Sequence, residues 1–103
     1  MDAKYMNLYG WSDVHPYEIV RWVSEKTVEI RAMQATLDPD WKPEFIPGGF
    51  AAHCTNQHTQ RYAYQSDPDA PVIRARLGKK GWKSERGMHK PSEKPRRFYD
   101  YNF

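Results

Sequence analysis

The sequence predicts an all-β protein, either a small, strongly bent antiparallel sheet or an SH3- or OB-like barrel, with about six short strands and long loops. Aromatic residues make up 15% of the chain and leucine occurs only three times, so the apolar residues are largely of types that favour strands. Eight prolines and six glycines supply many turn positions and disfavour a bundle of helices. The length of 103 residues predicts that residues 1–103 fold as one small domain.

The clearest strand pattern lies in residues 27–33, TVEIRAM, where apolar and polar residues alternate with a period of two. Residues 17–23, YEIVRWV, alternate less cleanly, and three residues separate the two runs, so together they predict a β-hairpin. A regular strand over residues 17–23 has two faces, one with Tyr17, Ile19, Arg21 and Val23 and the other with Val20 and Trp22.

The competing interpretation of the same region is one amphipathic helix over residues 17–37, with Pro16 in its first turn. Its apolar stripe would contain Ile19, Val23, Ile30, Met33 and Leu37. Lys26 or Thr27 would interrupt that stripe, and the many β-branched residues lower helix propensity, so the hairpin is favoured.

The rest of the chain divides into short strands and turns. We expect a loop over residues 38–49 with a short edge strand near 44–46, and strands over 49–55, 60–65 and 71–78. In the last of these, Ile73, Ala75 and Leu77 should face inward, and a tight GKKG loop should lead to a return strand at Trp82. Residues 84–97 are polar and basic and predict a mobile loop, whereas residues 96–103, RRFYDYNF, are aromatic enough to dock as a last strand.

The charge of the chain is unevenly distributed. Residues 1–60 contain five Lys or Arg and eight Asp or Glu, whereas residues 61–103 contain eleven and five. Between Arg74 and Arg97 there are ten basic residues and two acidic ones. Such a region can attract a small anion, a nucleic acid or an acidic protein surface, and its plainer interpretation is a solvated face that keeps the protein soluble.

The segment GGFAAHCTNQHTQ, residues 48–60, carries reactive types of side chain. Adjacent His53 and Cys54 would point to opposite faces of a strand, so they make a poor zinc site, and a Cys54 nucleophile lacks an evident oxyanion loop. One alternative is a glycine turn with Phe50 inward, Cys54 buried and the amides bonded to backbone. In the other, the polar side chains face a ligand pocket, since amides both donate and accept; these are His53, Asn56, Gln57 and Gln60.

Two further groups are candidate ligand-binding residues. In SDVHPY, Trp11, Asp13 and His15 form either one wall of a site or a turn in which Asp13 bonds backbone amides and His15 packs on Trp11. On the basic side, cations interleaved with aromatic rings could bind phosphates and bases, unless the rings are simply core; the residues are Arg74, Arg76, Lys79, Lys80, Lys83, Arg96, Arg97 and Tyr99, with Trp82, Phe98 and Tyr101 as the other rings.

The sequence also bears on the cellular setting. A single cysteine cannot form an internal disulfide, and the sequence shows neither a signal-peptide core nor an apolar run of membrane-spanning length. We therefore expect a soluble, cytoplasmic protein that does not contact a membrane.

Three segments, YGWSDVHPYEIV, RYAYQSDPDAPVIRARLGKKGWK and RRFYDYNF, together with GGFAAHCTNQ, carry a family resemblance. In this order they resemble a group of small proteins from tailed bacteriophages and prophages for which no reaction is settled. The resemblance implies a phage origin, residence in the cytoplasm of a bacterial host and interference with a host process such as immunity.

These observations lead to one expected function and two alternatives. We expect a binding protein without catalytic activity or cofactor, which captures a nucleotide-like ligand or a nucleic acid on a basic and aromatic surface. The first alternative is an inhibitor that docks its basic face on an acidic host protein. The second is a small hydrolase or metalloprotein that uses His53, Cys54 and His58. Assembly into a homo-oligomer is left open.

Overall fold

The computed structural model describes residues 3–48 and 51–102, and this part of the chain is all-β, as the sequence predicts. A short 3-10 turn, η1 (Gln57–Thr59), lies between the sixth and seventh strands. The strands are β1 (Tyr5–Tyr9), β2 (Val14–His15), β3 (Tyr17–Ser24), β4 (Thr27–Leu37), β5 (Phe45–Gly48), β6 (Ala51–Cys54), β7 (Tyr62–Ser66), β8 (Val72–Gly78), β9 (Gly81–Ser84) and β10 (Gly87–Ser92).

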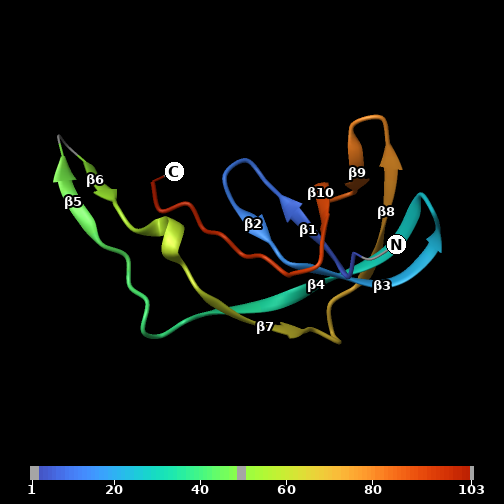
Figure 1. Cartoon of the computed structure of the whole chain (residues 1–103), viewed down its shortest axis with the longest axis horizontal. Helices are drawn as coiled ribbons and strands as arrows, with labels where there is room; N and C mark the ends of the chain where they lie inside the picture. The colour runs from blue at the N-terminus through green and yellow to red at the C-terminus, as the bar shows by residue number, and fades with distance from the viewer. Residues whose placement is uncertain (1–2, 49–50, 103) are drawn as a thin grey trace.

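Six antiparallel strands close into a small barrel in the order β10-β9-β8-β4-β3-β1, with β1 paired to β10. The long strand β4 continues beyond the barrel, and this second half of the strand pairs with β7. Strands β5 and β6 form a separate two-stranded sheet. Figure 1 shows the β8–β9 hairpin and the β5–β6 hairpin near opposite ends of the molecule, whose extents are 50 × 29 × 23 Å. The barrel thus carries one protruding arm.

The hydrophobic core lies inside the barrel and is built from strands that are far apart in the sequence. Apolar surface buried here stabilises the fold by roughly 25 cal/mol per Å². The buried members are Met6 of β1, Tyr17 of β3, Val28 and Ile30 of β4, Ala75 of β8 and Trp82 of β9.

The β3–β4 hairpin is confirmed, and the helix considered for residues 17–37 is wrong. The two faces predicted for β3 are correct only up to Ile19. A register shift between Ile19 and Arg21 inserts Val20 as a bulge, so Trp22 points inward and packs edge-on against Trp82 at 5.8 Å between ring centroids. Val23, at a second register shift between Trp22 and Ser24, is exposed. A single extra residue shifts the alternation of the side chains that follow it.

The strands predicted at 60–65, at 71–78 and from Trp82 are confirmed as β7, β8 and β9, and the edge strand near 44–46 is found as β5. Part of the strand expected over 49–55 is β6, whereas Phe50, expected inward, lies outside the described residues. In β8, Ala75 is fully buried and Ile73 packs against the core. Leu77 shares their face, opposite the buried Trp82, but is 39% exposed. Leu77 lies next to Gly78, the last residue of β8.

The expected mobile loop over residues 84–97 is wrong, because Gly87–Ser92 forms β10 and closes the barrel. Its His89 is buried although it is polar, since both ring nitrogens have partners: Nδ1 lies 2.8 Å from the Met6 carbonyl oxygen and Nε2 lies 2.6 Å from Ser84 Oγ. Polar groups enter a core when their hydrogen bonds are satisfied. The polar composition of this segment therefore did not indicate a strand with a buried side chain.

The C-terminal residues do not form the expected last strand. Phe98 makes an isolated bridge with Val14, and residues 99–102 lie outside the sheet. Phe103 lies outside the described residues. The segment is nevertheless docked, through side chains described below.

Candidate functional site

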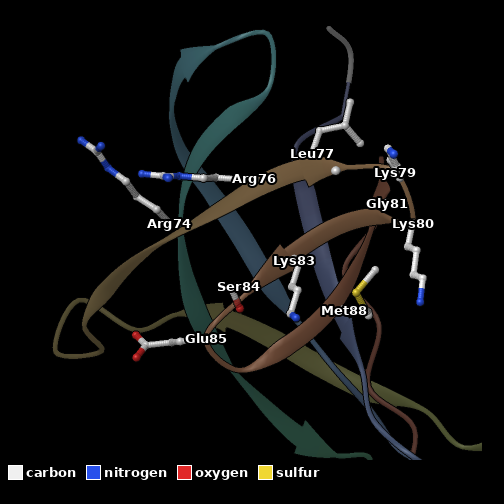
Figure 2. A pocket seen from close by; sticks show the side chains of 11 residues that line it. Arg74, Arg76, Leu77, Lys79, Lys80, Gly81, Lys83, Ser84, Glu85 and Met88 are labelled. Atoms are coloured by element: carbon white, nitrogen blue, oxygen red, sulfur yellow. The ribbon is translucent and has the colours of Figure 1, made fainter.

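A hollow of about 590 Å³ lies on the β8–β9 hairpin. We call it the basic hollow. Figure 2 shows Arg74 and Arg76 projecting from β8, Lys79 and Lys80 at the turn, and Lys83 on β9. The lining residues are Arg74, Arg76, Leu77, Gly78, Lys79, Lys80, Gly81, Lys83, Ser84, Glu85 and Met88.

Strand pairing decides which cations meet in the basic hollow. In β8, Arg74 and Arg76 flank the buried Ala75, so both guanidinium groups are on the outer face. Arg76 lies directly opposite Lys83 in the β8–β9 ladder. Like charges at directly opposed positions destabilise a sheet, and an anion bound between them would relieve the repulsion.

Arg74 differs from the other cations because it has an acidic partner. Its Nε lies 3.5 Å from an oxygen of Glu29, the residue opposite it on β4. Glu29 also accepts a hydrogen bond from Arg21, which lowers the pKa of this carboxyl group below its usual value. Within the described residues, Arg76, Lys79, Lys80 and Lys83 make no ion pair, and Glu85 is the one acidic residue that lines the hollow.

Lys79 and Lys80 form the turn between β8 and β9. Gly81 has φ +117°, a conformation that favours glycine, and it begins β9 directly after Lys79 and Lys80. Leu77 and Met88 add apolar surface to the same hollow. The cations can bind an anion by charge, and Leu77 and Met88 can contact an apolar part of the same ligand.

The predicted combination of cations with aromatic rings is not found at this place. No aromatic residue lines the basic hollow, and Trp82 is buried in the core. Arg96, Arg97 and Tyr99 are also outside its lining. The plainer interpretation of Trp82, as a core residue, is therefore correct.

A second, smaller hollow of about 380 Å³ brings together the residues predicted near the N-terminus and Tyr99. We call it the loop hollow; it is lined by Gly10, Trp11, Ser12, Asp13, His15, Tyr99, Asp100 and Tyr101. Trp11 is 94% exposed, so His15 does not pack firmly on it as the plainer interpretation proposed. Asp13 does bond backbone, because its Oδ1 accepts the N–H of Asp100 at 2.8 Å.

The amide side chains predicted to face a ligand instead hold the C-terminal segment. Gln60 bonds the backbone of Tyr99, and Gln57 Oε1 accepts the N–H of Tyr101 at 2.8 Å. Asn56 bonds the backbone of Lys42 and Glu44. These contacts agree with the plainer interpretation, in which the amides bond backbone. A ligand-binding role for the three amides stays a prediction.

Arg97 is also part of this attachment. Its Nη1 donates to the carbonyl oxygens of Val14 at 3.1 Å and Phe98 at 2.8 Å, and its guanidinium lies 5.8 Å from the Tyr99 ring. Arg96 is exposed, and its guanidinium carbon lies 6.0 Å from the Phe98 ring.

The histidines and the cysteine of residues 53–58 do not converge. Cys54 is buried, with its backbone N–H and carbonyl both bonded to the Asn102 side chain, whereas His53 and His58 are exposed. Across residues 3–48 and 51–102, no group of three or more His, Cys, Asp or Glu side chains is placed to hold a metal ion.

No protein-family model, curated protein or solved structure matches this chain. The phage-family resemblance therefore stays a prediction. In the described ranges, no helix has both the length and the apolar character needed to cross a bilayer.

Sequence reasoning missed one residue with a candidate role, Arg86. It lies in the turn between β9 and β10, inside the segment expected to be a mobile loop. The sequence offers little to distinguish it from the other basic residues around it, because its surroundings come from four distant strands.

Proposed function

We propose that this protein is a binding module without catalytic activity that contacts the phosphate backbone of nucleic acid through the basic hollow. The observation that carries the proposal is the direct opposition of Arg76 and Lys83, with Lys79 and Lys80 at the adjoining turn. Four cations without ion-pair partners in the described part of the chain offer phosphate contacts at little cost of breaking internal pairs.

The absence of aromatic rings from this hollow makes the proposal more specific. Stacking on rings gives single-stranded bases much of their affinity, whereas charge alone follows the backbone. Binding should therefore depend little on sequence and strongly on salt. A narrow pocket for one nucleotide fits this surface less well.

The motif resemblance suggests where such binding is used. In a bacterial cytoplasm during phage infection, a small basic barrel that covers nucleic acid would compete with host factors for the same phosphates. Interference with a host defence system is the biological role that we propose on this basis.

Salt-dependent binding of a labelled DNA duplex, followed by fluorescence anisotropy, tests the proposal. Four phosphate contacts predict a log–log salt slope of about −3.6 and roughly 100-fold weaker binding at about 200 mM than at about 50 mM salt. Removing two contacts with Lys79→Ala and Lys80→Ala should halve the slope. The matched control is the double variant Lys42→Ala with Lys94→Ala, which removes the same charge from exposed positions outside the basic hollow. This control should keep most of the wild-type salt slope.

An equal decrease of the salt slope in the two double variants would mean that DNA is attracted by the net charge of the protein and not by this surface. An acidic host protein remains the second candidate, because Leu77 and Met88 give the hollow apolar surface that a protein partner could bury. Binding that is absent for DNA but retained for an acidic protein after nuclease treatment would favour that candidate.

A further inference from the structure

A third cavity, of about 450 Å³, is separate from the basic hollow and shares no residue with it. We call it the arginine cavity. Its polar lining is His15 of β2, Tyr17 of β3, Arg86 of the β9–β10 turn and Arg97 of the C-terminal segment, and its apolar lining includes Leu8 of β1 and Met33 of β4. Its volume is in the range of small-molecule sites.

The charge of the arginine cavity is positive. Neither Arg86 nor Arg97 makes an ion pair within the described residues, and no carboxylate lines the cavity. Asp13 acts on His15 from the loop hollow, where its carboxylate accepts the Asp100 N–H. Two guanidinium groups thus face one cavity with no acidic residue in its lining.

Each arginine has a hydrogen-bond partner in the protein, although Arg86 is exposed. Arg97 is held by the carbonyl oxygens of Val14 and Phe98, which occupy only Nη1, and Arg86 Nη1 lies 3.4 Å from the Tyr17 hydroxyl. Carbonyl and hydroxyl oxygens orient a guanidinium without neutralising it. The other guanidinium nitrogens make no hydrogen bond within the described part of the chain, so each arginine keeps donors for a bidentate contact with an anion. Pre-positioned donors lower the entropy cost of binding.

His15 senses the same charges. Burial lowers its pKa, the nearby Arg97 lowers it further, and Asp13 acts in the opposite direction. Tyr17 and Arg86 share the cavity with it, and Tyr99, Asp100 and Tyr101 flank it in the loop hollow. An anion bound beside Arg97 would offset the effect of that arginine and favour the protonated ring.

We propose that the arginine cavity binds a small organic phosphate monoester, with the phosphate between Arg86 and Arg97 and its organic group against Leu8 and Met33. A dianion matches two guanidinium groups, whereas a carboxylate would leave one charge uncompensated. Contact of an organic group with the apolar side chains should make a phosphate monoester bind more tightly than inorganic phosphate. This site does not depend on the nucleic-acid contact proposed above.

Titration calorimetry with phenyl phosphate tests the proposal, with inorganic phosphate, benzoate and phenol as comparison ligands. We expect saturable binding of phenyl phosphate, weaker binding of inorganic phosphate and benzoate, and none of phenol. Arg86→Gln should weaken phenyl phosphate binding at least tenfold, since it removes one of two charged contacts. Arg76→Gln, a matched change in the basic hollow, should leave it within about twofold, because that residue is outside the cavity.

The wild-type protein gives a second readout if Arg86→Gln does not fold. Saturating phenyl phosphate should shift the proton NMR signals of the His15 ring and raise the midpoint of its titration. No binding of phenyl phosphate at millimolar concentration, an equal loss in Arg76→Gln, or an unmoved His15 signal would each overturn the proposal. DNA binding is measured separately, so the two proposals can fail independently.

Discussion

The side-chain amide of Gln60 pairs with both polar groups of the Tyr99 backbone. Its Oε1 accepts the Tyr99 N–H at 3.0 Å, and its Nε2 donates to the Tyr99 carbonyl oxygen. One side chain thereby supplies what a neighbouring strand would supply to that residue. Asn102 repeats the arrangement with the backbone of Cys54, so the C-terminal segment is docked without belonging to a sheet.

Replacing Gln60 by Ala should loosen the C-terminal segment more than it unfolds the barrel. The Tyr99 backbone can turn to water instead, so the expected loss is about 1 kcal/mol per hydrogen bond. Hydrogen exchange measured by NMR should show faster exchange at Tyr99 and Tyr101, with unchanged protection at Ile30.

Gln65→Ala is the matched control for that variant. Gln65 lies in β7, the strand that follows Gln60. It is exposed and has no side-chain hydrogen bond within the described residues. Exchange at Tyr99 that is the same in Gln60→Ala, Gln65→Ala and the wild type would show that the amide pair does not hold the segment.

The bulge at Val20 predicts which of two neighbouring residues the core needs. Trp22 packs against the core beside Trp82, whereas Val23 is 38% exposed. Trp22→Ala should lower the free energy of unfolding by about 3 kcal/mol, and Val23→Ala by less than about 1 kcal/mol. Urea unfolding followed by circular dichroism measures both. A larger loss in Val23→Ala than in Trp22→Ala would contradict the inward position of Trp22 that the Val20 bulge sets.

Acid should destabilise this protein partly through His89. Burial lowers the His89 pKa from the ordinary value of 6.5, and the hydrogen bond to the Met6 carbonyl opposes that change. As the pH falls below about 6.5, the unfolded chain therefore binds a proton that the folded chain resists. Above this pH, His89 is neutral in both states and the protein keeps the full stability that His89 contributes. Stability is lost as the pH falls from about 6.5 toward the lowered pKa of His89 in the folded protein.

Unfolding free energies at pH 7.5 and 5.5 check this prediction. The wild type should lose stability between the two, and His89→Gln should lose less, although it starts from a lower value because it disturbs the contact with Ser84. His15, whose pKa is also lowered, should contribute to the loss that remains. An equal loss in the wild type and the variant would remove His89 from the pH response.

The candidate sites were predictable to different degrees. Arg74 and Arg76 could be placed on one outer face because β8 alternates regularly around Ala75. Trp11, Asp13 and His15 were grouped correctly because they are neighbours in the sequence, and the structure adds Tyr99 to them. For Gln57 and Gln60 the sequence leaves two interpretations open, because an amide that can bind a ligand can equally bind the chain's own backbone, and in the structure both bond backbone.

The sequence by itself determined the all-β class, the β3–β4 and β8–β9 hairpins and the basic character of the second half. These follow from periodicity, turn residues and charge, which are local properties. Only the tertiary structure decided that β10 closes the barrel on β1, that Trp22 points inward, and that Arg86 and Arg97 face one cavity. Each of these depends on contacts between distant segments, where a satisfied hydrogen bond or one bulged residue outweighs local preference.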